Sequence, residues 1–115
     1  MEFSCTVRLT EERVVLTLAG DVDLAVHARF LAQVERWSSP STDMVIECSQ
    51  VAFMDSMGLQ VLAHAKKLAA ESGRDFALAA PSQPVLRLLE LAGVQDLFQV
   101  LGQSSDPEPD PGLAA

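Results

Sequence analysis

The chain has 115 residues, which is enough for one compact domain and too few for two. Its hydrophobic share of 49% and charged share of 21% are those of a globular protein. The net charge of -8 argues against nucleic acid and anionic membranes as partners, because both are negative, and no run suits a membrane span or a secretory signal. We therefore expect a cytoplasmic protein that binds neither nucleic acid nor membrane.

Two strands and a helix are predicted in the first third of the chain. Residues 3–9 alternate apolar and polar side chains, which indicates a strand with one buried face. Residues 14–19 are apolar and rich in β-branched side chains, as in a strand buried on both faces. Gly20 ends this strand and opens a turn, after which Asp23 is the N-cap candidate for a helix at residues 24–37.

The middle of the chain carries a strand that leads toward a serine. Residues 44–48 are mostly apolar and predict a central strand, with residues 49–53 as the approach to the serine loop. Glu47 interrupts this strand, and we place its carboxylate at the C-terminal end of the strand, near Ser56. A second helix is predicted at residues 57–72.

The last third contains one more strand and one more helix. Residues 76–80 predict a short strand, and a helix begins after Ser82 as its cap and ends at Gly93. Residues 97–100 are expected to pack back on the body as a turn or strand.

The order of these elements predicts an α/β fold. Alternation of strand and helix implies a largely parallel sheet with right-handed crossovers, and the opening hairpin adds an antiparallel pair. We expect a mixed, mostly parallel sheet of four to five strands packed with helices over residues 1–101, followed by a disordered acidic, proline-rich tail at residues 102–115. Functional groups of such sheets gather after the C-terminal ends of parallel strands, where Asp55 and Ser56 lie.

Ser56 has two interpretations. It can be the N-cap of the second helix, a role that contributes about 1 kcal/mol. It can also be a site of phosphate addition, because the first turn of a helix has unpaired N–H groups and the positive end of the helix dipole. The local sequence leaves both open.

Enzymatic chemistry is not predicted. A nucleophile elbow needs glycine two positions before the serine, where Met54 stands, and neither His27 nor His64 is the late histidine of a triad. No glycine-rich phosphate loop and no metal-ligand spacing occurs, so we expect no catalytic residue, no metal and no cofactor. Cys5 and Cys48 fall in predicted strands and are expected to be core thiols.

Three segments stand in a specific order and spacing. They are residues 20–24 (Gly-Asp-Val-Asp-Leu), residues 45–59, which run from the central strand through the serine loop, and residues 88–98, which cover the last helix and the turn after it. Together they resemble the STAS domain family, specifically the small stand-alone anti-sigma factor antagonists of bacteria. The resemblance covers residues 3–101.

This resemblance implies a STAS fold and a partner-switching mechanism. The unphosphorylated antagonist binds an anti-sigma factor that is also a serine kinase, which frees the sigma factor. The kinase then uses ATP to phosphorylate the serine of the antagonist, the complex falls apart, and a phosphatase of the PP2C type restores the serine. By position, Ser56 is the phosphoacceptor.

The partner-binding surface implied by the resemblance lies around this serine. Its residues are Asp23, Asp55, Ser56, Met57, Gly58 and Gln60. A polar stripe on the second helix either extends this surface or is an ordinary solvated face; it consists of Gln60, His64, Lys67 and Glu71. Two residues depart from the family pattern, because Glu47 replaces the usual aspartate of the central strand and Met57 replaces a small residue after the serine.

A phosphate on the serine would act through its charge. It adds about −1.5 to −2 at pH 7, next to Asp55 on an acidic protein, and lowers partner affinity about a hundredfold or more through repulsion and desolvation. We expect little remodelling of the domain, because a helix N-terminus accepts an anion.

Two other functions remain open. One is that of the docking subunit of a lipid-transporting ABC complex, in which the serine need not be phosphorylated, and the other is that of a ligand-sensing STAS module. We expect a monomer and leave open a dimer formed through an exposed edge strand.

Overall fold

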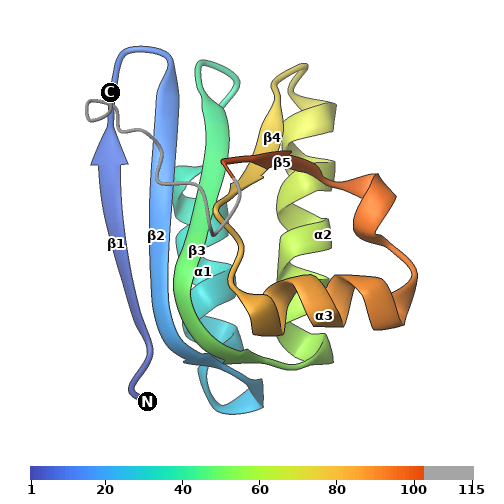
Figure 1. Cartoon of the computed structure of the whole chain (residues 1–115). Helices are drawn as coiled ribbons and strands as arrows, with labels where there is room; N and C mark the ends of the chain where they lie inside the picture. The colour runs from blue at the N-terminus through green and yellow to red at the C-terminus, as the bar shows by residue number, and fades with distance from the viewer. Residues whose placement is uncertain (103–115) are drawn as a thin grey trace, which may run out of the picture.

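The computed structural model describes residues 1–102. Within them, five strands and three α-helices follow one another, with a short 3-10 helix before the first α-helix and another before the last strand (Figure 1). In chain order the elements are β1 (Ser4–Leu9), β2 (Arg13–Val22), η1 (Leu24–Val26), α1 (His27–Trp37), β3 (Asp43–Met54), α2 (Ser56–Glu71), β4 (Phe76–Ala79), α3 (Gln83–Ala92), η2 (Gln95–Leu97) and β5 (Gln99–Leu101).

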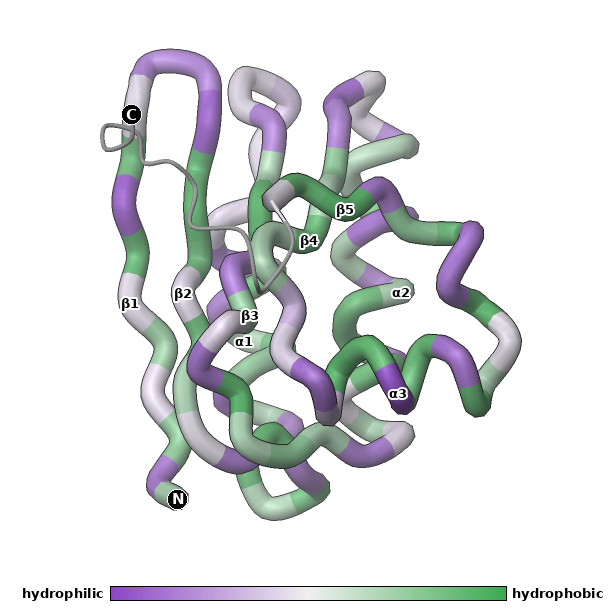
Figure 2. Tube along the Cα trace, in the orientation of Figure 1, coloured by the Kyte–Doolittle hydropathy of each residue, from purple (hydrophilic) through white to green (hydrophobic). Residues whose placement is uncertain are grey.

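The strands form one sheet in the order β1-β2-β3-β4-β5. β1 and β2 are antiparallel, whereas β2, β3, β4 and β5 pair in parallel. This confirms the predicted mixed, mostly parallel sheet. Figure 2 shows that the tip of the hairpin between β1 and β2 is hydrophilic, as is usual for a turn, and that hydrophobic and hydrophilic residues alternate along β1.

The hydrophobic core lies between one face of the sheet and helices α1 and α2. The strand register places Leu16, Ile46 and Leu78 side by side, and all three are fully buried. Phe30 of α1 and Leu62 of α2 are fully buried in the same cluster. α3 lies across the end of the sheet at which β3 bends, and Ser82 anchors it by donating its hydroxyl hydrogen to the Val51 carbonyl oxygen at 2.7 Å (Figure 1).

Two strands are longer than predicted. β2 continues past Gly20 to Val22, and β3 continues through the expected approach loop to Met54. The two extensions pair with each other, with Val22 opposite Met54. The register between β2 and β3 shifts between Thr17 and Ala19 and again between Gly20 and Asp21. The predicted turn was therefore wrong at residues 20–22, which belong to β2, and the predicted approach to the serine loop at residues 49–53 is part of β3.

Glu47 does not lie near Ser56, contrary to our prediction. It lies in the middle of β3, between Thr17 of β2 and Ala79 of β4, and its Oε1 accepts a hydrogen bond from the backbone N–H of Ser49 at 3.3 Å. The error follows from the length of β3, because the strand continues seven residues beyond Glu47 to Met54.

The helix boundaries agree more closely. The predicted first helix begins as the 3-10 turn η1 before α1, and α3 ends at Gly93, whose φ of 71° is left-handed as in a glycine C-cap. The predicted return of residues 97–100 corresponds to the end of η2 and most of β5. The predicted tail lies outside the described residues, apart from Gly102.

Both cysteines are free thiols, as expected. Cys48 is buried in the core, and Cys5 is half-buried on β1. Burial raises the pKa of the Cys5 thiol, and burial together with the neighbouring Glu47 carboxylate raises the pKa of Cys48 to about 12.

Candidate functional site

The serine loop lies at the C-terminal end of β3, where the chain enters α2. Asp55 has an extended backbone (φ −105°, ψ −174°) and is the N-cap, while Ser56 is the first residue of the helix. The prediction of Ser56 as a possible cap was therefore wrong by one residue. Asp55 and Ser56 are both residue types that are common at N-caps. Because β3 extends to Met54, Asp55 is the residue that occupies the cap position.

The Asp55 carboxylate makes three hydrogen bonds. Oδ1 accepts from the backbone N–H groups of Met57 at 2.9 Å and Gly58 at 3.2 Å, which caps α2. Oδ2 accepts from the backbone N–H of Leu24 at 3.0 Å. The backbone N–H of Asp55 donates to the Val22 carbonyl at 3.2 Å, so this residue fastens the start of α2 to the chain segment that follows β2.

Asp23 has the capping role predicted from the sequence. Its Oδ1 accepts from the backbone N–H of Ala25 at 3.1 Å and caps η1. Since β2 and β3 are parallel neighbours, their C-terminal ends meet, and the Asp23 turn lies beside the Ser56 loop. The structure thus brings together two segments that the sequence analysis assigned to one surface.

The predicted partner-binding residues differ in how exposed they are to solvent. Ser56 and Gln60 are exposed and Met57 is half-buried, so their side chains can reach another molecule. Gly58 is buried, and a Cβ atom there would lie 2.7 Å from Cγ of Met54 and 3.0 Å from Cγ1 of Val22. Its role is therefore close packing of α2 on the sheet.

Leu24 was not predicted from the sequence as part of this surface. Its side chain is 67% exposed, although leucine is usually buried, and its backbone is held by Asp55. The sequence gives little indication that Leu24 is exposed. It was predicted as the first residue of the helix at residues 24–37, and an apolar residue is common in the first turn of such a helix.

The polar stripe of α2 is confirmed as a surface feature. Gln60, Lys67 and Glu71 are exposed, and His64 is half-buried. His64 Nε2 lies 3.2 Å from Glu35 Oε2 of α1, above a shallow hollow between α1 and α2 that is also lined by His27. Both histidines therefore lie in one groove, but within residues 1–102 no three His, Cys, Asp or Glu side chains are placed to hold a metal ion.

The comparison with protein families decides the classification. A family profile described as "Mlab, STAS domain" matches residues 5–102. The chain belongs to the STAS domain family. This STAS domain keeps the fold expected from the resemblance, with the serine loop between its central strand and second helix.

Relatives of this STAS domain carry a common description. An anti-sigma-B factor antagonist of Bacillus subtilis (strain 168) is 23% identical over 104 residues, which are 90% of this chain and 95% of that protein. An anti-sigma factor antagonist of Mycobacterium paratuberculosis has a solved structure that is 27% identical, with a TM-score of 0.68 and coverage of 87% and 86% of the two chains.

The anti-sigma factor antagonist SpoIIAA shares the fold in two states. Its unphosphorylated form matches with a TM-score of 0.73 at 18% identity, covering 89% of this chain and 91% of that chain. Its phosphorylated form, from Bacillus, matches with a TM-score of 0.68 at 16% identity, covering 89% and 95%. Within residues 1–102 of this STAS domain, no helix combines the length and apolar character needed to cross a membrane.

Proposed function

We propose that this STAS domain is an anti-sigma factor antagonist. In its unphosphorylated form it binds an anti-sigma factor and so frees a sigma factor, and phosphorylation of Ser56 ends the binding. The observation that carries the proposal is that Ser56 is exposed as the first residue of α2, directly after the N-cap Asp55. The description of the Bacillus subtilis relative, which aligns over nearly the whole of both chains, supports it.

The proposed partners are an anti-sigma factor that is also a serine kinase and a phosphatase of the PP2C type. The kinase would transfer the γ-phosphoryl group of ATP to Ser56 Oγ, with loss of the hydroxyl proton and release of ADP. The phosphatase would hydrolyse the phosphoserine and return phosphate to solvent. The existence of SpoIIAA in phosphorylated and unphosphorylated forms supports a cycle of this kind.

The geometry of the serine loop supports an electrostatic effect of the phosphate. Oδ1 of Asp55 already accepts from the N–H groups of Met57 and Gly58, which are the groups that a phosphate at a helix N-terminus would seek. A phosphate on the exposed Ser56 therefore adds a second anion beside an existing one. A partner that docks here must desolvate both charges, which lowers its affinity.

An affinity-capture experiment tests the proposal. The baits are Ser56→Ala, Ser56→Glu and Ser72→Glu in otherwise identical chains, incubated with lysate of the source organism and analysed by mass spectrometry. Ser72 is exposed at the other end of α2, so the last bait controls for added charge alone. We expect one ATP-binding serine kinase on the Ser56→Ala and Ser72→Glu baits and its loss with Ser56→Glu.

A second step connects the captured protein to the chemistry. The purified kinase, supplied with ATP, is expected to phosphorylate the wild-type chain at Ser56 and to leave Ser56→Ala unmodified. Modification at another serine, or no kinase on any bait, would overturn the assignment of Ser56.

One observation favours a second candidate, the docking subunit of a lipid-transporting ABC complex. The family profile that matches this chain is described as Mlab and not as an anti-sigma factor antagonist. Capture of transporter subunits by all three baits would support this alternative and would leave Ser56 as an ordinary first residue of α2. The ligand-sensing alternative stays a prediction.

A further inference from the structure

The Asp55 carboxylate joins two segments that are 31 positions apart in the sequence. Its two oxygens are held unequally, because Oδ1 accepts two hydrogen bonds from α2 and Oδ2 accepts one, from the backbone N–H of Leu24. The carboxylate thus reaches Leu24 through a single bond, and the backbone N–H of Asp55 adds a second link by donating to the Val22 carbonyl at 3.2 Å.

The bridge fixes an exposed leucine beside the serine loop. η1 is capped by Asp23 at the N–H of Ala25, and Asp55 holds the preceding N–H, that of Leu24. The two bonds hold the N-terminal end of this short 3-10 turn, whose other end continues into α1 and is anchored by the buried Val26. With 67% of its side chain exposed, Leu24 offers an apolar anchor of the kind that contributes strongly to protein interfaces when it is buried by a partner.

We infer that Asp55 is a positioning residue through which the charge on Ser56 controls η1, so that a phosphate on Ser56 loosens the hydrogen bond between Asp55 Oδ2 and the Leu24 N–H and releases Leu24 from the docking surface. This inference rests on the proposed function in taking Ser56 as the phosphoacceptor. It adds Leu24 to that surface and gives Asp55 a role other than direct contact with the partner.

Competition for the same donors provides the coupling. A phosphate on Ser56 is attracted to the N–H groups of Met57 and Gly58, and it repels the carboxylate that occupies them. Any displacement of the carboxylate strains its third bond, the hydrogen bond that Oδ2 accepts from the Leu24 N–H. Phosphorylation then weakens partner binding by repulsion and also by loss of a fixed apolar anchor. This second effect goes beyond the purely electrostatic action expected from the sequence, but it is confined to η1 and leaves the rest of the domain unchanged.

The test follows the backbone amide of Leu24 by ¹⁵N NMR and requires no partner. Phosphoserine is incorporated during translation at position 56, or at position 72 as the control for equal charge on the same helix. Asp55→Asn keeps an oxygen that can cap α2 but replaces the second oxygen with an NH₂ group, which cannot accept from Leu24. Asp23→Asn is the matched control, because Asp23 uses a single oxygen.

We expect phosphoserine at position 56 to raise the solvent-exchange rate of the Leu24 amide about fivefold, the effect of losing one hydrogen bond, and phosphoserine at position 72 to leave it unchanged. Asp55→Asn should raise the rate to a similar extent and remove any further response to phosphoserine at position 56. Asp23→Asn should leave the Leu24 rate unchanged. Ser56→Glu serves as a second, weaker test of the same coupling.

Two results would overturn the inference: an unchanged Leu24 amide with phosphoserine at position 56, or a response of equal size in the Asp55→Asn background. Neither result depends on which protein binds the domain. The outcome of affinity capture and the outcome of this measurement can therefore be distinguished.

Discussion

Gly58 lies in the first turn of α2, where the helix packs against Val22 at the end of β2. Its missing side chain leaves room for Met54 and Val22, which are both buried. A glycine inside a helix costs about 1 kcal/mol relative to alanine, so its presence here indicates a packing requirement. The same close approach brings the first turn of α2 within reach of the chain segment that follows β2.

Gly58→Ala is expected to destabilise the domain. The new methyl group would overlap Met54 and press on Val22, and overpacking of this kind costs about 1–3 kcal/mol, which exceeds the gain in helix propensity. Urea unfolding monitored by circular dichroism measures the change. Gln60→Ala, at an exposed position of the same helix, is the control and should change stability by less than about 0.5 kcal/mol. A Gly58→Ala variant as stable as the wild type would contradict the packing role.

Cys48 predicts a specific dependence of stability on pH. Its folded pKa of about 12 lies above the unfolded value of about 8.5, so the unfolded chain loses the thiol proton first as the pH rises. The stabilisation is complete below about pH 8.5 and is lost between there and about pH 12, at up to about 1.4 kcal/mol per pH unit.

Urea unfolding at pH 8 and pH 10 checks this dependence, with Cys48→Ala as the reference. The wild type should lose more stability than Cys48→Ala over this interval, and the absence of tyrosine removes one competing titration. Equal losses in the two proteins would show that the thiol ionises as easily in the folded state as in the unfolded state.

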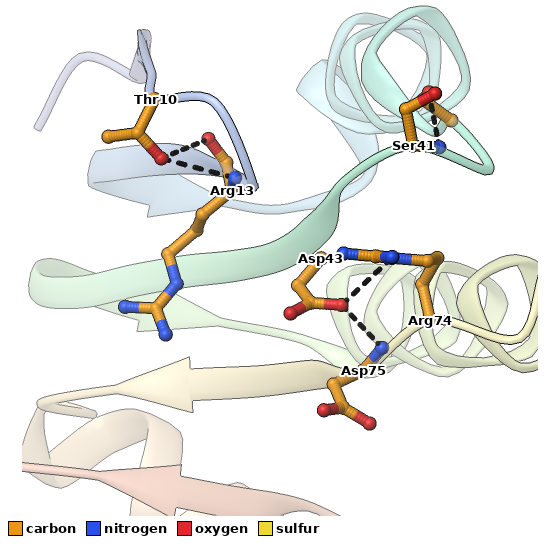
Figure 3. A network of polar contacts seen from close by, with 7 residues as sticks. Thr10, Arg13, Ser41, Asp43, Arg74 and Asp75 are labelled. Atoms are coloured by element: carbon orange, nitrogen blue, oxygen red, sulfur yellow. Dashed lines mark hydrogen bonds and ion pairs between the residues drawn. The ribbon is translucent and has the colours of Figure 1, made fainter.

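At the scale of elements, a polar cluster fixes the start of β3 to the turn before β4. Oδ1 of Asp43 accepts a hydrogen bond from the backbone N–H of Asp75 at 3.0 Å and lies 3.0 Å from Nε of Arg74 (Figure 3). The Arg74 Nε–H does not point along a hydrogen bond, so this second contact is an ion pair. Both side chains are about 70% buried, which reduces solvent screening.

Asp43→Ala is expected to destabilise the domain by about 1–3 kcal/mol, because the Asp75 N–H loses a charged acceptor and the Arg74 guanidinium loses its ion-pair partner. Asp43→Asn keeps an acceptor oxygen and loses only the charge, so its cost should stay near the 1 kcal/mol or less that is typical of a partly solvated ion pair. Thermal unfolding of the two variants measures the difference. Equal losses would show that the ion pair, and not the hydrogen bond, is the stabilising contact.

At the scale of the whole molecule, we expect the centre of the sheet to resist local opening more than its edges. β3 pairs on both sides along its first half and carries several core residues, whereas β1 and β5 are edge strands and β5 has only three residues. Local opening costs most where burial and pairing are greatest.

Hydrogen exchange should follow this order. We expect the amides of β2 and β3 that pair around Leu16 and Ile46 to exchange slowest and those of β5 to exchange fastest among the strands. Residue-resolved exchange measured by NMR gives the order directly. Protection of β5 equal to that of β3 would indicate that another molecule covers that edge, for example in a dimer.

Much of the fold could be predicted from the sequence because its signals are local. Alternation in residues 3–9 located β1. Gly93 marked the end of α3, because glycine is the residue that most readily adopts the left-handed φ found there. The extensions of β2 and β3 could not be predicted, because Gly20 and the polar residues after Cys48 resemble strand ends until their pairing partners are known. The error on Glu47 followed from this.

The sequence by itself determined the class of the sheet, the helices around it, and the place of a serine after a mostly apolar strand, since periodicity and turn residues act over a few positions. Only the tertiary structure decided that Asp55 is the cap and that Leu24 belongs beside Ser56. The bond between Asp55 and Leu24 spans 31 positions, and it forms because β2 and β3 are parallel neighbours whose ends meet. Contacts of this kind depend on strand order, which local patterns do not contain.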